Sequence, residues 1–137
     1  MSLELVVSHT MGEIQIIAAT FTEWPLIVEY ENRIEVDTKT QTDPFLCVKT
    51  KFLDGYQVEI SDRPHQRWIG QVHLAAAIPD GAGVAKARKL LDFFYPKLQR
   101  KKFGLMRTRM AEPGGVTDHL GWEYHGVIVP FWADVPT

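Results

Sequence analysis

A stretch of alternating side chains from Trp68 to Ile78 constrains the fold more than any other feature of the sequence. Alternation with a period of two is typical of a β-strand, because successive side chains point to opposite faces of a sheet. The small alanines just before Ile78 leave one face able to accept a closely packed helix. The stretch therefore predicts a central strand with a helix against it.

A turn and a helix are predicted directly after this strand. The segment from Pro79 to Gly83 is typical of a turn, and Pro96 is expected to end or kink the following helix near its last turn. Six apolar residues mark one stripe of that helix, at Val84, Ala87, Leu90, Leu91, Phe94 and Leu98. The backbone amides of Asp80–Gly83 could cradle a phosphate, but Lys86 stands where a dinucleotide-binding motif has its third glycine. A tight strand-to-helix connection explains the glycines better.

The N-terminal half is expected to contain a helix and several strands. Apolar residues from Leu3 to Phe21 predict a helix that Ser2 could cap and that Glu23-Trp24-Pro25 ends. The other expected elements are a short strand over 26–30, a polar surface loop or extended arm over 31–44, and a hairpin with strands over 45–52 and 56–60 around the turn Asp54-Gly55.

The C-terminal part is expected to be β-structure. We predict a strand over 105–110, a turn at Glu112-Pro113-Gly114-Gly115 and a final strand from Gly121 to Trp132. The order of helix, strands, helix and strands predicts an α+β fold, with an antiparallel or mixed sheet of about five strands and two helices packed on one face as an α/β sandwich.

Length and composition favour one ordinary globular domain, residues 1–137. With 45% hydrophobic and 23% charged residues, the chain has no compositional support for disorder. A formal charge of −2 argues against a domain whose main work is to neutralise nucleic-acid phosphates. The single cysteine, Cys47, excludes an internal disulfide and favours a buried thiol in a reducing compartment. Without a long apolar stretch or a secretion signal, we expect a soluble protein made in a cytoplasm and no membrane partner.

The most enzyme-like stretch is Asp118, His119, Glu123 and His125, since these side chains are all metal-ligand types. A small metal-dependent hydrolase is therefore one alternative function. The spacing lacks the His-Glu-x-x-His pattern of a zinc helix, and residues along a strand are dispersed rather than convergent, so exposed strand side chains are the favoured interpretation.

A basic cluster between Lys97 and Arg109 is the one candidate nucleic-acid surface, which makes a nucleic-acid-binding module the second alternative. Its members are Lys97, Arg100, Lys101, Lys102, Arg107 and Arg109. Basic residues near a helix C-terminus are also favoured by the helix dipole, and no stacking motif accompanies them. No serine or cysteine lies in a nucleophile-elbow context. We therefore expect no catalytic residues, no cofactor, no metal and no specific nucleic acid.

Several segments follow one another in a fixed order: Glu31-Asn32-Arg33 after a Trp-Pro segment, Pro44 leading into a β-run, Gln66 to Val72 continuing to Ile78, the Pro79 to Gly83 turn with its helix, and the closing strand from Gly121-Trp122 to Phe131. This order of segments resembles that of the tail terminator, or tail completion, proteins of tailed bacteriophages. The resemblance covers about four fifths of the chain by the order of elements.

This resemblance implies a structural protein that forms a six-fold ring on the head-proximal end of the tail tube, stops tube polymerisation and presents a surface for joining the head. The implied partners are other copies of the chain, the tail tube protein and a head-completion or connector protein. The implied location is the virion tail, after assembly in the bacterial host cytoplasm.

A closed ring needs two different patches on each subunit. We expect these on the arm from Arg33 to Pro44, the hairpin at Asp54-Gly55 and the loop from Met110 to His119. The candidate interface residues are Arg33, Asp37, Lys39, Asp54, Trp68, Arg109, Asp118 and Trp132.

Overall fold

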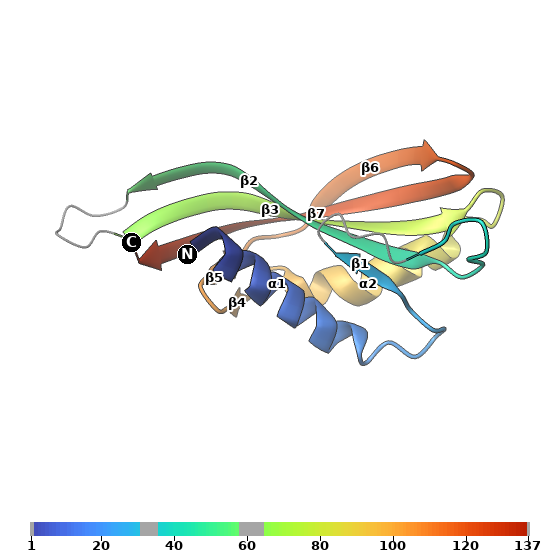
Figure 1. Ribbon diagram of the computed structural model, residues 1–137, viewed down its shortest axis with the longest axis horizontal. Coiled ribbons are helices and arrows are strands. Elements are labelled where there is room, and N and C mark those ends of the chain that lie inside the picture. Colours follow the sequence, from blue (N-terminus) through green and yellow to red (C-terminus); the bar gives the residue numbers. More distant parts are fainter. Residues whose placement is uncertain (1, 31–35, 58–64, 137) are drawn as a thin grey trace.

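The computed structural model describes residues 2–30, 36–57 and 65–136 of the 137-residue chain (Figure 1). Two helices lie in this part of the chain, α1 (Ser2–Ala18) and α2 (Ala85–Leu98). The strands are β1 (Val28–Tyr30), β2 (Phe45–Gln57), β3 (His65–Pro79), β4 (Lys102–Phe103), β5 (Met106–Thr108), β6 (Glu112–His119) and β7 (Trp122–Pro136).

The strands form one mixed sheet in the order β1-β2-β3-β7-β5-β4, and β6 also pairs with β7. The β1–β2 pairing is parallel, and the other pairings are antiparallel. The alternating stretch lies in β3, which pairs with β2 on one side and with β7 along its whole length on the other. The predicted central strand is therefore confirmed.

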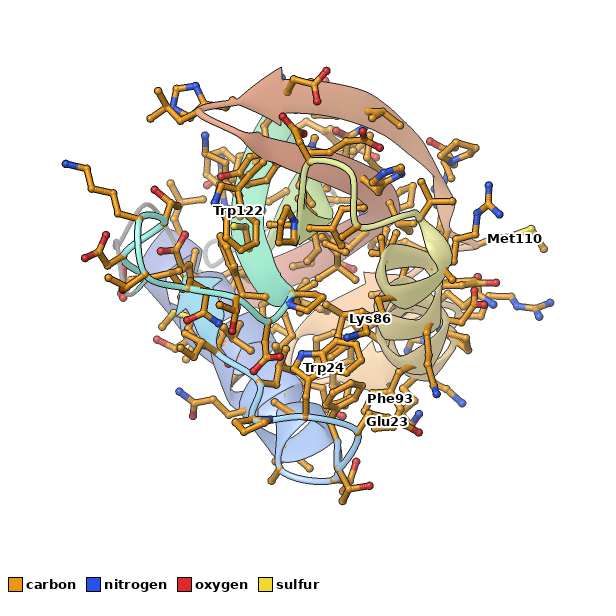
Figure 2. All side chains as sticks on the ribbon, turned by 90° about the vertical axis from the view of Figure 1, so that its right-hand side faces the viewer. Glu23, Trp24, Lys86, Phe93, Met110 and Trp122 are labelled. Atoms are coloured by element: carbon orange, nitrogen blue, oxygen red, sulfur yellow. The ribbon has the colours of Figure 1, made fainter. Side chains whose placement is uncertain are left out.

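The prediction of an α+β chain is also confirmed, but the details of the predicted sandwich are not exact. The sheet has seven strands instead of about five. The long strands β2, β3 and β7 twist and curve, so the sheet bends around the helices (Figures 1 and 2). The arrangement is a curved half-barrel that wraps around the helices, which differs from the predicted α/β sandwich of about five strands with two helices packed on one face.

The main core lies between the helices and the face of the sheet that curves around them. Val72, Leu74 and Ala76 alternate along β3 and are buried with Leu90 and Phe94 of α2. Five of the six residues of the predicted helical stripe form the buried side of α2, whereas Val84 precedes the helix and is half-buried. Pro96 lies in the last turn of α2, and the helix ends two residues later at Leu98, as expected.

An aromatic cluster joins the end of α1 to α2 (Figure 2). The rings of Phe21 and Trp24 meet edge to face at 4.8 Å, and Phe21 meets Phe93 of α2 at 5.0 Å. The Lys86 ammonium lies 5.7 Å from the Trp24 ring, and Lys89 binds Glu23 at 2.9 Å. The prediction that Glu23-Trp24-Pro25 ends this helix is wrong, because α1 already ends at Ala18. The segment instead packs the chain that follows α1 against α2.

A smaller core lies on the opposite face of the sheet. Phe45, Ala77 and Trp122 are buried there together with Val36. The Trp122 indole donates a hydrogen bond to the Thr38 carbonyl at 3.2 Å. Residues 36–44 thus form the predicted surface loop but fold back onto the sheet, which corrects the alternative of an extended arm for this part of the segment.

The predicted hairpin turn at Asp54-Gly55 is wrong, because both residues lie inside β2. The register shifts between Phe52 and Asp54, which marks a bulge, and pairing with β3 then continues. A Cβ atom on Gly55 would lie 2.6 Å from the Trp68 ring, so the glycine provides room for the indole instead of a turn. Residues 58–60 of the predicted returning strand lie outside the described residues.

The predicted turn at Glu112–Gly115 is also wrong, since these residues belong to β6 and pair with β7 across a bulge. The predicted Met110–His119 loop is therefore mostly a strand. The reversal occurs at Leu120-Gly121, between two strands that pair in register. The strand predicted over 105–110 exists only as the shorter β5.

Candidate interaction surfaces

The sheet face opposite the helices carries a cationic patch around Trp132. Directly paired residues of neighbouring strands point to the same face. Ile69 pairs with Trp132, Trp132 with Arg107, and Arg107 with Lys102, so these four side chains form one row across the sheet. Arg107 and Lys102 are exposed.

Two guanidinium groups lie over the Trp132 ring. The Arg67 Cζ atom is 5.9 Å from the ring centroid, and the Arg109 Cζ atom is 5.2 Å from it. Arg67 is oriented by a bidentate pair with Asp134, at 2.7 and 2.8 Å. Hydrogen bonds to Asp134 and Tyr56 raise the pKa of Arg67 above its ordinary value, so this cation is permanent. The indole therefore has two guanidinium groups near its ring, of which Arg67 is held in place by Asp134.

Two exposed lysines of β2, Lys49 and Lys51, extend the patch. Lys49 pairs with His73 of β3, and the pKa of His73 is lowered by partial burial and by the charges of Lys51 and Lys49. We call this surface the Trp132 face, defined by Lys49, Lys51, Arg67, Lys102, Arg107, Arg109 and Trp132. Its register also brings the acidic side chains Asp54, Glu112 and Asp134 to the same side of the sheet.

The hairpin that joins β6 to β7 forms a different surface at the other end of β7. Leu120 has φ 50° and Gly121 has φ 83°, which is the left-handed pair that a two-residue hairpin turn needs. Asn-Gly normally fills such a turn, because a leucine is disfavoured at positive φ. The Leu120 side chain is nevertheless 78% exposed.

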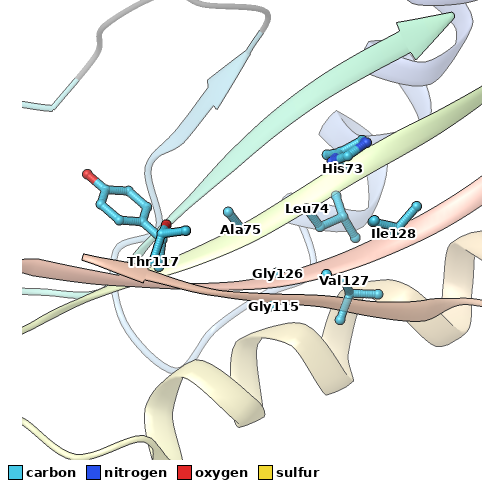
Figure 3. Close-up of a pocket in the computed structure, with 10 residues that line it drawn as sticks. His73, Leu74, Ala75, Gly115, Thr117, Gly126, Val127 and Ile128 are labelled. Atoms are coloured by element: carbon cyan, nitrogen blue, oxygen red, sulfur yellow. The ribbon is translucent and has the colours of Figure 1, made fainter. Parts of the chain in front are cut away.

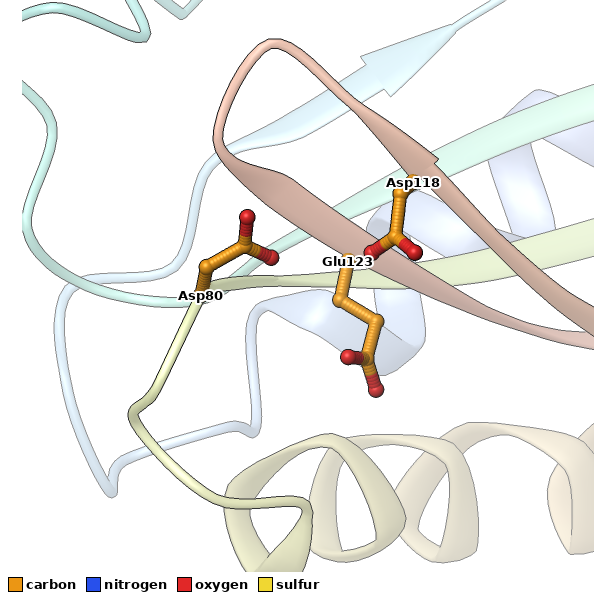
Figure 4. A group of neighbouring side chains, drawn as sticks. All are labelled: Asp80, Asp118 and Glu123. Atoms are coloured by element: carbon orange, nitrogen blue, oxygen red, sulfur yellow. The ribbon is translucent and has the colours of Figure 1, made fainter.

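Carboxylates surround the base of this hairpin. Carboxylate oxygens of Asp80, Asp118 and Glu123 all lie within 4.8 Å of one another (Figure 4). Glu123 also contacts His125, with Oε1 2.5 Å from Nε2. We call Asp80 together with residues 118–123 the β6–β7 tip. Its composition is acidic with one protruding apolar side chain, whereas the Trp132 face is mainly basic.

The structure brings together only part of the candidate metal set. Asp118 and Glu123 are cross-strand neighbours, and His125 joins them through Glu123. His119 pairs with Trp122 one position further along, so its side chain points to the opposite face. Asp80, from the turn after β3, is the neighbour that sequence spacing did not reveal. Exposed acidic groups of this kind are common without an ion.

The candidate nucleic-acid cluster divides between two places. Lys97 lies on α2, where its ammonium sits 3.8 Å from the Phe93 ring and donates to the Phe93 carbonyl. Lys102, Arg107 and Arg109 belong to the Trp132 face. The basic run in the sequence is therefore not one continuous surface.

A shallow depression of about 120 Å³ lies on the same side of the sheet as the Trp132 face, between β3, β6 and β7 (Figure 3). It exists because Gly115 and Gly126 carry no side chains there, and His73, Thr117 and Tyr124 form its rim. It lacks the enclosed volume typical of a small-molecule site.

The other proposed interface residues occupy varied environments. Asp37 accepts a hydrogen bond from the Lys39 amide at 3.0 Å in the loop over the small core, and Arg33 lies outside the described residues. Asp54 is exposed within β2. Trp68 faces the main core, where its ring packs edge to face on Phe52 at 6.1 Å.

Cys47 is a partly buried thiol, whereas the sequence predicted a buried one. Burial, and then the charge of Glu29 and a hydrogen bond to it, raise the pKa of Cys47 from 9.0 to about 12. The thiol is therefore neutral near pH 7 and has little nucleophilic character.

Comparisons with known proteins define the fold only. No protein-family model and no curated protein matches the chain. Ten chains of solved structures match it, including one whose name carries no functional information. That structure aligns with a TM-score of 0.63 and 19% identity over 98% of this chain and 96% of the other. Within the described residues, neither helix is long and apolar enough to cross a membrane.

Proposed function

We propose that this chain is a structural subunit of a tailed bacteriophage, which assembles head to tail into a six-membered ring on the head-proximal end of the tail tube. In this role it ends tube polymerisation and offers a surface for head joining. The phage assignment follows from the sequence resemblance described above. The structure supports a more general part of the proposal, namely that this chain acts through contacts with other proteins.

Leu120 is the observation that carries this part of the proposal. A non-glycine residue in the left-handed region costs about 1–2 kcal/mol, and a 78% exposed leucine recovers little of that cost by burial. Neither property helps the isolated chain to fold. Local strain combined with an exposed apolar side chain is expected where a residue serves a contact outside its own fold.

The basic Trp132 face and the acidic β6–β7 tip are further support. They lie at opposite ends of β7, and they are unlike each other in charge. Unlike patches on one subunit are what a heterologous, ring-closing interface requires. The two alternative functions, hydrolase and nucleic-acid module, each draw on only part of their expected residues, because His119 and Lys97 lie apart from the rest.

The substitution Leu120→Asn tests the proposal. It creates the Asn-Gly pair preferred in this turn, so we expect the free energy of unfolding to rise by about 1 kcal/mol. Light scattering and negative-stain images should show rings for the wild-type chain, and ring formation should weaken at least tenfold for the variant. Val116→Thr, which changes another exposed apolar residue of β6, is the matched control and should still form rings.

Two results would contradict the proposed function. One is a wild-type chain that stays monomeric at millimolar concentration and does not bind the ends of purified tail tubes. The other is a Leu120→Asn variant that assembles as well as the wild type, which would remove the supporting role of Leu120.

A further inference from the structure

The two surfaces at the ends of β7 differ in charge. On the Trp132 face, Lys102, Arg107 and Arg109 are exposed around a half-buried indole. At the β6–β7 tip, Asp80 and Asp118 are exposed and Glu123 is half-buried. The two ends of β7 therefore carry surface patches of opposite charge.

The distance between the surfaces prevents one molecule from joining them. Glu123 and Trp132 are nine residues apart on β7, which corresponds to about 30 Å at the rise of a β-strand. They also point to opposite faces, since Glu123 pairs with Ile78 on the helix side and Trp132 pairs with Ile69 on the other. The complementary charges can meet only between two copies of the chain.

We propose that the β6–β7 tip of one copy docks on the Trp132 face of the next copy. Carboxylates of Asp80 and Asp118 lie against Arg107 and Arg109, and Leu120 covers the exposed part of the Trp132 ring. This contact deepens the proposed function and rests on it, because it supplies the subunit–subunit interface of the ring.

The complementary charges of the two surfaces, and the apolar contact between Leu120 and Trp132, both favour a second copy of the chain as the partner that binds the Trp132 face. Carboxylate–guanidinium pairs give geometric specificity, and an aromatic ring beside arginines is typical of an interface centre. The leucine finds in the Trp132 ring the burial that its own fold does not provide. A single strand of nucleic acid would use the same arginines, but it would leave the acidic tip and Leu120 without a role.

Two charge reversals test the contact from its two sides. Asp118→Lys alters only the tip, and Arg107→Glu alters only the face. Each variant alone should sediment as a monomer under conditions in which the wild type forms rings. An equimolar mixture should recover assembly, because the intact tip of one variant fits the intact face of the other and the two reversed side chains are again opposite in charge. Raising the salt to 1 M should weaken wild-type assembly, since exposed charges are screened within a few ångströms.

Matched controls carry the same reversals on the exposed surface of α2. Asp92→Lys and Arg88→Glu should assemble like the wild type. Circular dichroism of all four variants should show folded protein, so that lost assembly is not lost folding.

These experiments distinguish failure of the proposed docking contact from failure of the proposed ring-forming function. Rings that persist in both Asp118→Lys and Arg107→Glu would overturn the docking contact and leave the ring function standing. A wild type that never assembles would overturn both. Tight binding of a fluorescent oligothymidylate, lost in Arg107→Glu while ring formation is unchanged, would replace the second copy with nucleic acid as the occupant of the Trp132 face.

Discussion

Gly70 occupies a position in β3 where the structure has no room for a side chain. A Cβ atom there would lie 2.5 Å from the Lys51 carbonyl oxygen and 2.6 Å from Cζ of Phe131. The oxygen belongs to the backbone of the neighbouring strand, and the Phe131 ring is 2% exposed and packed against Phe52 at 6.0 Å. Neither atom can move without disturbing the centre of the sheet.

The substitution Gly70→Ala should therefore destabilise the protein. Overpacking costs about 1–3 kcal/mol, and a backbone obstacle favours the upper part of that range. Removing a glycine from a strand returns about 0.5–1 kcal/mol, which leaves a net loss of about 2 kcal/mol. With an unfolding entropy of about 2.1 cal/mol/K per residue, this loss lowers Tm by about 7 °C.

Gly12→Ala provides the matched control, because a Cβ on Gly12 meets nothing within 4 Å and the residue lies inside α1. This variant should gain about 0.5–1 kcal/mol from helix propensity. Urea titration followed by circular dichroism measures both changes. A Gly70→Ala variant as stable as the wild type would refute the reasoning, since it would mean that the strands yield at little cost.

Three further outcomes are expected. Thr108→Val should lower the free energy of unfolding by about 1–3 kcal/mol in urea titrations. The reason is that the buried Thr108 hydroxyl donates to the Leu98 carbonyl and accepts from the Lys101 amide. Thr117→Val, at an exposed position, should change the free energy of unfolding little. The Cys47 thiol should resist iodoacetamide at pH 8 in the native state and react once urea unfolds the chain; rapid native labelling would contradict its burial. Because folding raises the pKa of Cys47 from 9.0 to about 12, its contribution to stability should be complete below pH 9 and decrease as the pH rises towards 12, and Cys47→Ala should show a weaker alkaline loss.

Periodicity was sufficient to predict the elements whose side chains face the core. The strand around Leu74 and the helix carrying Leu90 were predicted because burial imposes a period of two on one and of about three to four on the other. The same logic gave the α+β class. It did not give the curvature of the sheet, which depends on twist and bulges that no local pattern records.

Turn prediction failed where a glycine has a packing role. Asp54-Gly55 and Gly114-Gly115 are typical turn sequences, yet Gly55 makes room for Trp68, and Gly114 lies beside the backbone of Gly126 on the neighbouring strand. The true reversal at Leu120-Gly121 was missed because leucine is unfavourable there.

The candidate surfaces were only partly visible in the sequence. Arg109, Trp132 and Asp118 were named as interface candidates, and the structure places the first two side by side. Asp80 and Arg67 were not named, because their neighbours are brought to them by strand register rather than by spacing along the chain. Register depends on the whole sheet and was not predictable from these residues.

The length of β7 also matters for the proposed assembly, because the two halves of the proposed intersubunit contact lie towards its two ends. In the proposed ring, the distance along this strand would set how far each docking step advances. The nine-residue separation of Glu123 and Trp132 would fix that step, and the built-in twist of the strand would set the angle between successive subunits. A pair of residues added to both β3 and β7 would lengthen the step by about 7 Å and enlarge the bore of the annulus.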